Sequence, residues 1–216
     1  MTLTISKTRL LETLQLQAKE TPDYLPVGLI RENSIVGLSF DIMTRVLYGK
    51  HTSIDNLESL QAIRCASRLM NLGFDETVVS AMLCHKLIRL SAELHLKTFM
   101  EIAENTSYTI AKITEESSYL PNTESPEEYL EKLSEYMILH WQVFAVIGGD
   151  WENTLVKMQA DGEYRPYSEI TLMTELLPSI QKDWLYWKSL TPTCEHSRMD
   201  AIWENIFRLA NEIETN

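Results

Sequence analysis

The stretch QAIRCASRLMNLGFDETVVSAMLCHKLIR, from Gln61 to Arg89, decides the fold of this chain. Apolar residues recur at helical spacing on both sides of Gly73, and a glycine at such a point commonly ends a helix. We therefore expect two buried helices joined at Gly73. The second is apolar nearly all round, which predicts a central position, and it carries His85 and Lys86 inward near its end.

The remaining sequence also favours helices. The 216 residues include only seven glycines and seven prolines. These fall between segments of helical periodicity, and no segment has the alternation of a strand. We expect a single all-α domain spanning 1–216. Its helices are expected at residues 6–19, 35–47, 57–72, 75–87, 97–104, 107–117, 126–147, 151–158, 168–177, 180–190 and 199–213.

A helix break is expected at the glycine pair 148–149. Ser125 followed by Glu128 is the pattern of a capping box, so a helix should begin there. We expect this helix to end at the glycine pair, with a separate helix over 151–158. Asp150 would then stand where an N-cap residue is favoured.

The charge and the composition exclude several classes of protein. The formal net charge is −12 and the isoelectric point about 4.9. An acidic surface repels phosphate backbones, so we predict no nucleic-acid partner. The N-terminal residues lack a signal-peptide pattern, and no stretch approaches the roughly 20 apolar residues of a membrane span. We therefore predict a cytoplasmic protein with no membrane partner.

The cysteines predict no covalent or metal framework. Cys65, Cys84 and Cys194 are odd in number and widely spaced, which fits neither a disulfide scaffold nor a Cys-rich zinc site. The first two stand in apolar helical surroundings, where a thiol acts as a small hydrophobe. Helical spacing likewise favours core packing over a binding surface for three tryptophans, Trp184, Trp187 and Trp203.

Residues 57–86, LESLQAIRCASRLMNLGFDETVVSAMLCHK, resemble the core of the HD hydrolase family, most closely its (p)ppGpp-hydrolase branch. In that branch a His opens one helix, a Leu-x-Leu-Asp-like turn follows, and an Ala-x-Leu-Leu-His-Asp motif ends the next helix. Residues 73–77 match the turn, and residues 81–85 match the run up to the motif.

The likeness extends over about residues 40–160. Ile113-Thr114 is similar to a Val-Thr pair of the family, and residues 146–151 are similar to its Lys-Leu-Ala-Asp-Arg helix. The resemblance implies an HD-domain-like helical bundle with additional N- and C-terminal helices in the flanking residues 1–39 and 161–216.

The family's chemistry uses two His and two Asp around a divalent ion, usually Mn²⁺, which polarises phosphate and generates a hydroxide nucleophile. Transferred onto this chain, the four ligand positions fall on Gln61, His85, Lys86 and Asp150. A cation at position 86 repels a divalent ion, and a buried ammonium is costly unless it is paired. The resemblance therefore implies no intact catalytic site and no metal. We predict that the Lys86 ammonium takes the metal's place and forms a salt bridge with Asp150.

The same residues leave an anion site open. Lys50, His85, Lys86 and Arg89 are candidates for holding a phosphorylated ligand, since cations at helical spacing can bind phosphate. The alternative is that His85 is a core histidine bonded to Asp150 or to Gln61, with the cations in ordinary ion pairs. The other histidines have no ligand spacing and are expected at the surface or bonded in place.

Binding is the function that the resemblance favours. We expect a catalytically inactive HD-like protein that binds a protein partner or a phosphorylated small ligand through its C-terminal amphipathic helix or its acidic face. The alternative is a metal-dependent phosphohydrolase acting on a nucleotide such as (p)ppGpp, which would need Mn²⁺. A second alternative is a helical structural or oligomerisation protein, so a homo-oligomer also stays open.

Overall fold

The structure is a computed structural model that describes residues 34–50, 57–85, 87–88, 95–118, 125–161 and 168–214. Every regular element in these ranges is helical, which confirms the predicted all-α fold, and none of these helices is long and apolar enough to cross a membrane. The helix expected at residues 6–19 lies outside the described ranges. The elements are α2 (Ile35–Lys50), α3 (Leu57–Asn71), α4 (Glu76–Cys84), α5 (His95–Asn105), α6 (Tyr108–Glu116), α7 (Pro126–Leu139), α8 (Gln142–Asp161), α9 (Ser168–Lys182), α10 (Trp184–Ser189), the 3-10 helix η3 (Thr193–Glu195) and α11 (His196–Glu214).

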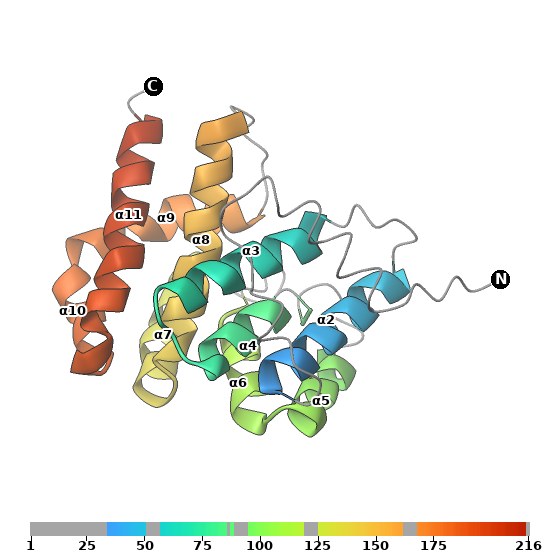
Figure 1. The fold of residues 1–216 in the computed structure, drawn as a ribbon. Coiled ribbons are helices and arrows are strands. Elements are labelled where there is room, and N and C mark those ends of the chain that lie inside the picture. The colour runs from blue at the N-terminus through green and yellow to red at the C-terminus, as the bar shows by residue number, and fades with distance from the viewer. Residues whose placement is uncertain are drawn as a thin grey trace.

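Helix α8 lies at the centre of this arrangement, between two groups of helices (Figure 1). α11 packs along one side of it, and α3, α4 and α6 contact it elsewhere. On the far side of α4 lies α2, and α5 pairs with α6. Because α8 touches both α11 and the α3–α4 unit, it joins the C-terminal helices to the stretch that decides the fold.

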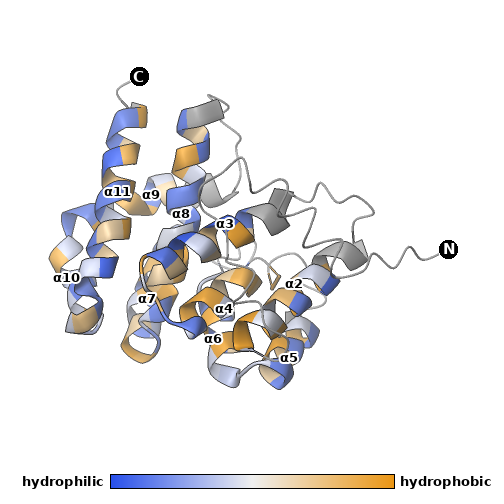
Figure 2. Ribbon diagram, viewed as in Figure 1, coloured by the Kyte–Doolittle hydropathy of each residue, from blue (hydrophilic) through white to orange (hydrophobic). Residues whose placement is uncertain are grey.

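The α3–α4 unit forms as its sequence predicts. Gly73 follows α3 with a φ of 86°, a left-handed conformation that glycine adopts without steric cost. Asp75 then caps α4, because its carboxylate accepts the Val78 N–H at 3.0 Å. Residues 78–84 of α4 are all buried, and Figure 2 shows the helix as almost wholly hydrophobic. The expected central position of this helix is confirmed.

The prediction that a helix ends at the glycine pair 148–149 is wrong. The chain leaves the helical region earlier, at His140, where α7 ends with φ −136° and ψ 76°. α8 runs through both glycines, and at these positions its neighbours come very close. A Cβ on the first would lie 2.8 Å from the Ile202 side chain of α11, and a Cβ on the second 3.1 Å from Leu69 of α3. Asp150 consequently lies inside α8 and is not an N-cap.

Other helix ends agree with the expectation or differ for a local reason. The capping box is confirmed: Ser125 Oγ accepts the Glu128 N–H at 3.2 Å, and Glu128 returns a bond to the Ser125 N–H at 2.8 Å. The break expected between residues 177 and 180 is wrong, because α9 continues through Pro178 and the interruption falls at Asp183. α2 likewise continues past its expected end to Lys50.

The core reading of the tryptophans is confirmed. Trp203 of α11 is fully buried, and its ring stacks on Phe144 of α8 with 4.1 Å between centroids. Trp184 and Trp187 of α10 lie within 6.2 Å and 5.6 Å of Phe144. The apolar face of α11 is therefore covered by α8 and α10. The opposite, polar face of α11 is exposed, so the predicted partner contact through this helix stays a prediction.

Candidate functional site

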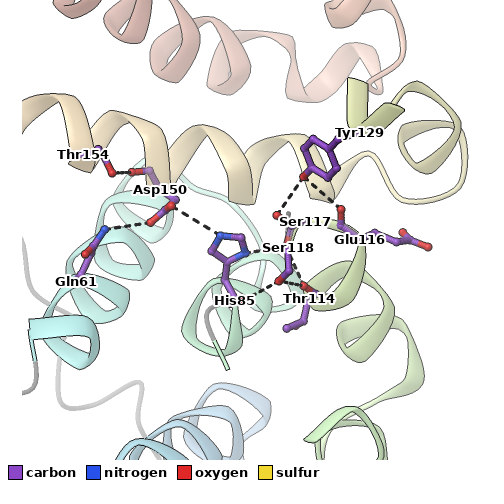
Figure 3. A network of polar contacts seen from close by, with 9 residues as sticks. All are labelled: Gln61, His85, Thr114, Glu116, Ser117, Ser118, Tyr129, Asp150 and Thr154. Carbon is purple, nitrogen blue, oxygen red and sulfur yellow. Dashed lines mark hydrogen bonds and ion pairs between the residues drawn. The ribbon is translucent and has the colours of Figure 1, made fainter. Parts of the chain in front are cut away.

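Gln61, His85 and Asp150 come from three elements and meet at one point (Figure 3). Gln61 lies on α3, His85 directly follows α4, and Asp150 lies in the middle of α8. The Gln61 amide donates to Asp150 Oδ1 at 3.2 Å, and His85 Nε2 lies 3.8 Å from Asp150 Oδ2. Three of the four positions grouped by the resemblance are thus neighbours in space.

This meeting point lies inside the protein. His85 is 8% exposed and Asp150 only 2%. A carboxylate at this depth needs partners from its own chain, because water is not there to solvate it. The 3.8 Å contact with the imidazole is an electrostatic one, being longer than a hydrogen bond. Gln61 supplies a direct hydrogen bond to the other oxygen.

The opposite edge of the imidazole faces the end of α6. His85 Nδ1 lies 2.9 Å from Ser117 Oγ, which identifies His85 as a bonded core histidine, although through Ser117 and not through Gln61. Ser118 Oγ reaches the His85 carbonyl at 2.8 Å and the Thr114 carbonyl at 2.7 Å. These contacts bind the C-terminal end of α4 to the C-terminal end of α6.

Helix α7 closes the end of α6 from outside. The Tyr129 hydroxyl lies 3.2 Å from the Ser117 carbonyl and 3.4 Å from that of Glu116, carbonyls that a helix end leaves without intrahelical donors. The Glu116 carboxylate accepts from His140 Nδ1 at 2.7 Å. A continuous set of polar contacts therefore runs from α3 through α8, α4 and α6 to α7.

A second polar cluster lies two residues further along α8. Glu152, 4% exposed, accepts two hydrogen bonds from Arg68 of α3, each 3.0 Å long, and one from Asn205 of α11 at 2.6 Å. This bidentate pairing is the strong form of a carboxylate–guanidinium contact. It ties α3, α8 and α11 together and has no counterpart among the expected site residues.

Several predicted site residues lie outside the part that the structure describes. Lys86 and Arg89 are among them, so the salt bridge between Lys86 and Asp150 stays a prediction. Lys50 is the last residue of α2, and its side chain is also outside the described set. The proposed anion site therefore has only His85 within the described residues.

The described donors do not fit the family's divalent ion. No group of three or more His, Cys, Asp and Glu side chains in the described ranges is placed to hold a metal. Only His85 and Asp150 are ligand types of the family, and Gln61 turns an N–H toward the carboxylate. A divalent ion needs lone pairs from its surroundings. The arrangement of the described residues suits a closed polar contact better than a cation.

The residue before His85 carries a buried thiol. Cys84 is fully buried, and this burial raises the pKa of its thiol to about 12, although a bond toward Ser39 acts to lower it. Cys65 is buried as well, and Cys194 is exposed. The expectation that Cys65 and Cys84 act as small hydrophobes agrees with this burial.

The sequence reading did not find Ser117, Ser118 and Tyr129. A usable pattern was present: Ile110 and Thr114 of α6 and the two serines that follow this helix, Ser117 and Ser118, recur at helical spacing, and all are buried. Buried hydroxyls grouped at a helix end indicate a local polar network. Which acceptors they reach depends on α4, and that contact could not be read from spacing.

No protein-family model, curated protein or solved structure matches this chain.

Proposed function

We propose that this chain is an HD-like helical protein whose former metal site has become a closed polar contact, and that it acts by binding and not by hydrolysis. The observation that carries the proposal is the double contact on Asp150, from Gln61 at 3.2 Å and His85 at 3.8 Å. Residues 89 positions apart meet here, as the motif resemblance requires. The buried carboxylate is contacted by the protein's own groups, so it does not depend on a bound cation.

Metal analysis and turnover test the absence of hydrolysis. We expect the purified protein to contain no stoichiometric Mn²⁺ and to show no hydrolysis of (p)ppGpp or other nucleotides when Mn²⁺ is added. Stoichiometric Mn²⁺ together with turnover would establish the phosphohydrolase alternative instead.

A restored ligand set tests the HD-like arrangement itself. In the double variant Gln61→His, Lys86→Asp, four family ligand types stand again at the four positions. Because imidazole and carboxylate groups suit Mn²⁺, we expect this variant to gain Mn²⁺ binding by calorimetry. Adding His85→Ala to the double variant is the matched control and should abolish the gain. A double variant that stays folded and binds no Mn²⁺ would contradict the HD-like arrangement.

A thermal-shift screen separates the binding classes. A phosphorylated ligand that binds only the folded state raises Tm by an amount that grows with the logarithm of its concentration above Kd, so a nucleotide that raises Tm identifies the ligand class. If no nucleotide does so, a protein partner is the remaining form of the proposal. Affinity capture with the acidic wild-type chain, against a variant with three acidic residues of α7 changed to Gln (Glu128, Glu131 and Glu135), then tests the acidic face.

A further inference from the structure

His85 has a neighbour at each ring nitrogen, and together they decide where its proton lies. Nδ1 is 2.9 Å from Ser117 Oγ, and Nε2 is 3.8 Å from Asp150 Oδ2. A neutral imidazole has one N–H donor and one acceptor nitrogen. An unprotonated Nε2 would direct its lone pair at a carboxylate oxygen, which is unfavourable at low local dielectric. The carboxylate therefore favours the proton on Nε2, with Nδ1 as the acceptor, but a 3.8 Å contact is longer than a hydrogen bond and does not hold the tautomer by itself.

Ser117 is placed to supply the donor that Nδ1 then needs. Its hydroxyl has one hydrogen and two acceptors in reach, His85 Nδ1 at 2.9 Å and the Thr114 carbonyl at 3.2 Å. The imidazole is the nearer acceptor. The Thr114 carbonyl also has a closer donor of its own, Ser118 Oγ at 2.7 Å. Both considerations direct the Ser117 hydrogen to His85.

We propose that Ser117 is a positioning residue: it donates to His85 Nδ1 and so holds the ring in the Nε2–H tautomer that faces Asp150 (Figure 3). The proposal rests on the proposed function and deepens it. A histidine binds a metal through an unprotonated nitrogen, and the hydrogen bond at its other nitrogen selects which one that is. With a donor at Nδ1, Nε2 keeps its hydrogen and is closed to a metal. Ser117 is 3% exposed, so solvent does not compete for this bond.

Nitrogen-15 NMR of the full-length protein reads the tautomer directly. At the alkaline end of a pH series, where the ring signals no longer change with pH, we expect the wild-type His85 ring to be a single Nε2–H tautomer. In Ser117→Ala the donor is gone, and we expect loss of this single-tautomer preference. Ser117→Thr keeps a hydroxyl and should retain it. Ser134→Ala, which removes a hydroxyl bonded only within α7, is the matched control and should leave His85 unchanged.

Three results would overturn the assignment: a wild-type ring protonated at Nδ1 alone, a ring protonated at both nitrogens, or an unchanged single tautomer in Ser117→Ala. If Ser117→Ala does not fold, the tautomers of the wild type and of Ser117→Thr still test the assignment. The role of Ser117 and the proposed function are refuted by different results. Mn²⁺-dependent hydrolysis by a protein whose metal-free ring is Nε2–H would refute the proposed function alone, and an Nδ1–H ring in a protein without turnover would refute only the role of Ser117.

Discussion

Helix α8 has two unlike faces. One carries Phe144, Gly148 and Trp151 at helical spacing and packs on α11 by ring and methyl contacts. The other places Asp150 against Gln61 and His85 by polar contacts. Ring contacts depend on volume and shape, whereas polar contacts depend on where donors and acceptors lie. The aromatic face should therefore be sensitive to changes of side-chain volume, and the polar face to the loss of a single donor or acceptor.

The aromatic face should show the largest loss. Trp203→Ala removes a fully buried side chain in contact with Phe144, Trp151 and Phe207. Large-to-small changes of this kind lower the free energy of unfolding by about 3–5 kcal/mol, and urea denaturation would measure it. Leu185→Ala, at a side chain 80% exposed, is the control and should change stability by less than about 0.5 kcal/mol. Equal effects for the two variants would contradict a packed aromatic face.

A single methyl group tests how tightly that face is closed. At Gly148 a Cβ would lie 2.8 Å from Ile202 and 3.1 Å from Trp203. Helix propensity alone predicts that Gly148→Ala stabilises by about 1 kcal/mol. Overpacking should reverse the sign and give a net loss of about 1–3 kcal/mol in urea denaturation.

A double-mutant cycle supplies the control for this change. In an Ile202→Ala background the added methyl group finds room, so the cost of Gly148→Ala should fall. Gly149→Ala should cost less than Gly148→Ala, because its nearest neighbour is a Leu69 methyl at 3.1 Å. A stabilising Gly148→Ala would show that α11 moves away from α8 freely.

Cys84, the residue before His85, makes the stability of the fold depend on pH. Its pKa is about 12 in the fold and about 9.0 in the unfolded chain, so above pH 9 the folded state holds more protons. Stability from the neutral thiol is therefore complete below pH 9 and is lost as pH rises through this window, by about 1 kcal/mol between pH 9 and about pH 10. Denaturation of the wild type and of Cys84→Ala at both pH values measures how the free energy of unfolding changes with pH. The loss due to the thiol should be absent in Cys84→Ala. Equal slopes would place the thiol in water.

The smallest expected change in stability comes from substituting two buried serines, Ser118 and Ser80, which differ in their hydrogen bonds. The Ser118 hydroxyl has one hydrogen and two carbonyl acceptors in reach, those of His85 and Thr114. Ser118→Ala should therefore lower the free energy of unfolding by about 0.5–1.5 kcal/mol. Ser80 Oγ has no hydrogen-bond partner in the described part of the chain, and Ser80→Ala should be neutral or stabilising. Thermal denaturation of both variants compares them at matched volume loss. A larger loss for Ser80→Ala would mean that its hydroxyl is satisfied after all.

Several helix ends could be predicted from the sequence because they depend on local interactions. Gly73, Asp75 and Ser125 act through contacts with residues only a few positions away, so the helix ends that they set follow from sequence. The glycine pair 148–149 misled because glycine often ends helices. There it instead leaves space for Ile202 and Leu69, and no local pattern announces a neighbour so distant in sequence.

In the candidate site, too, some residues were predicted from the sequence and others were found only in the structure. The motif likeness placed Gln61, His85 and Asp150 together before any coordinates, because residue type and order carry that information. Ser117 joins them only because the end of α6 packs beside the end of α4. An acidic, all-helical chain follows from composition and periodicity, whereas the grouping of Gln61, His85, Lys86 and Asp150 came from the family resemblance, and residue 86 lies outside the described residues. Tertiary structure decided which donors face the described members of this group, because a hydrogen bond depends on a fraction of an ångström that helical periodicity does not specify.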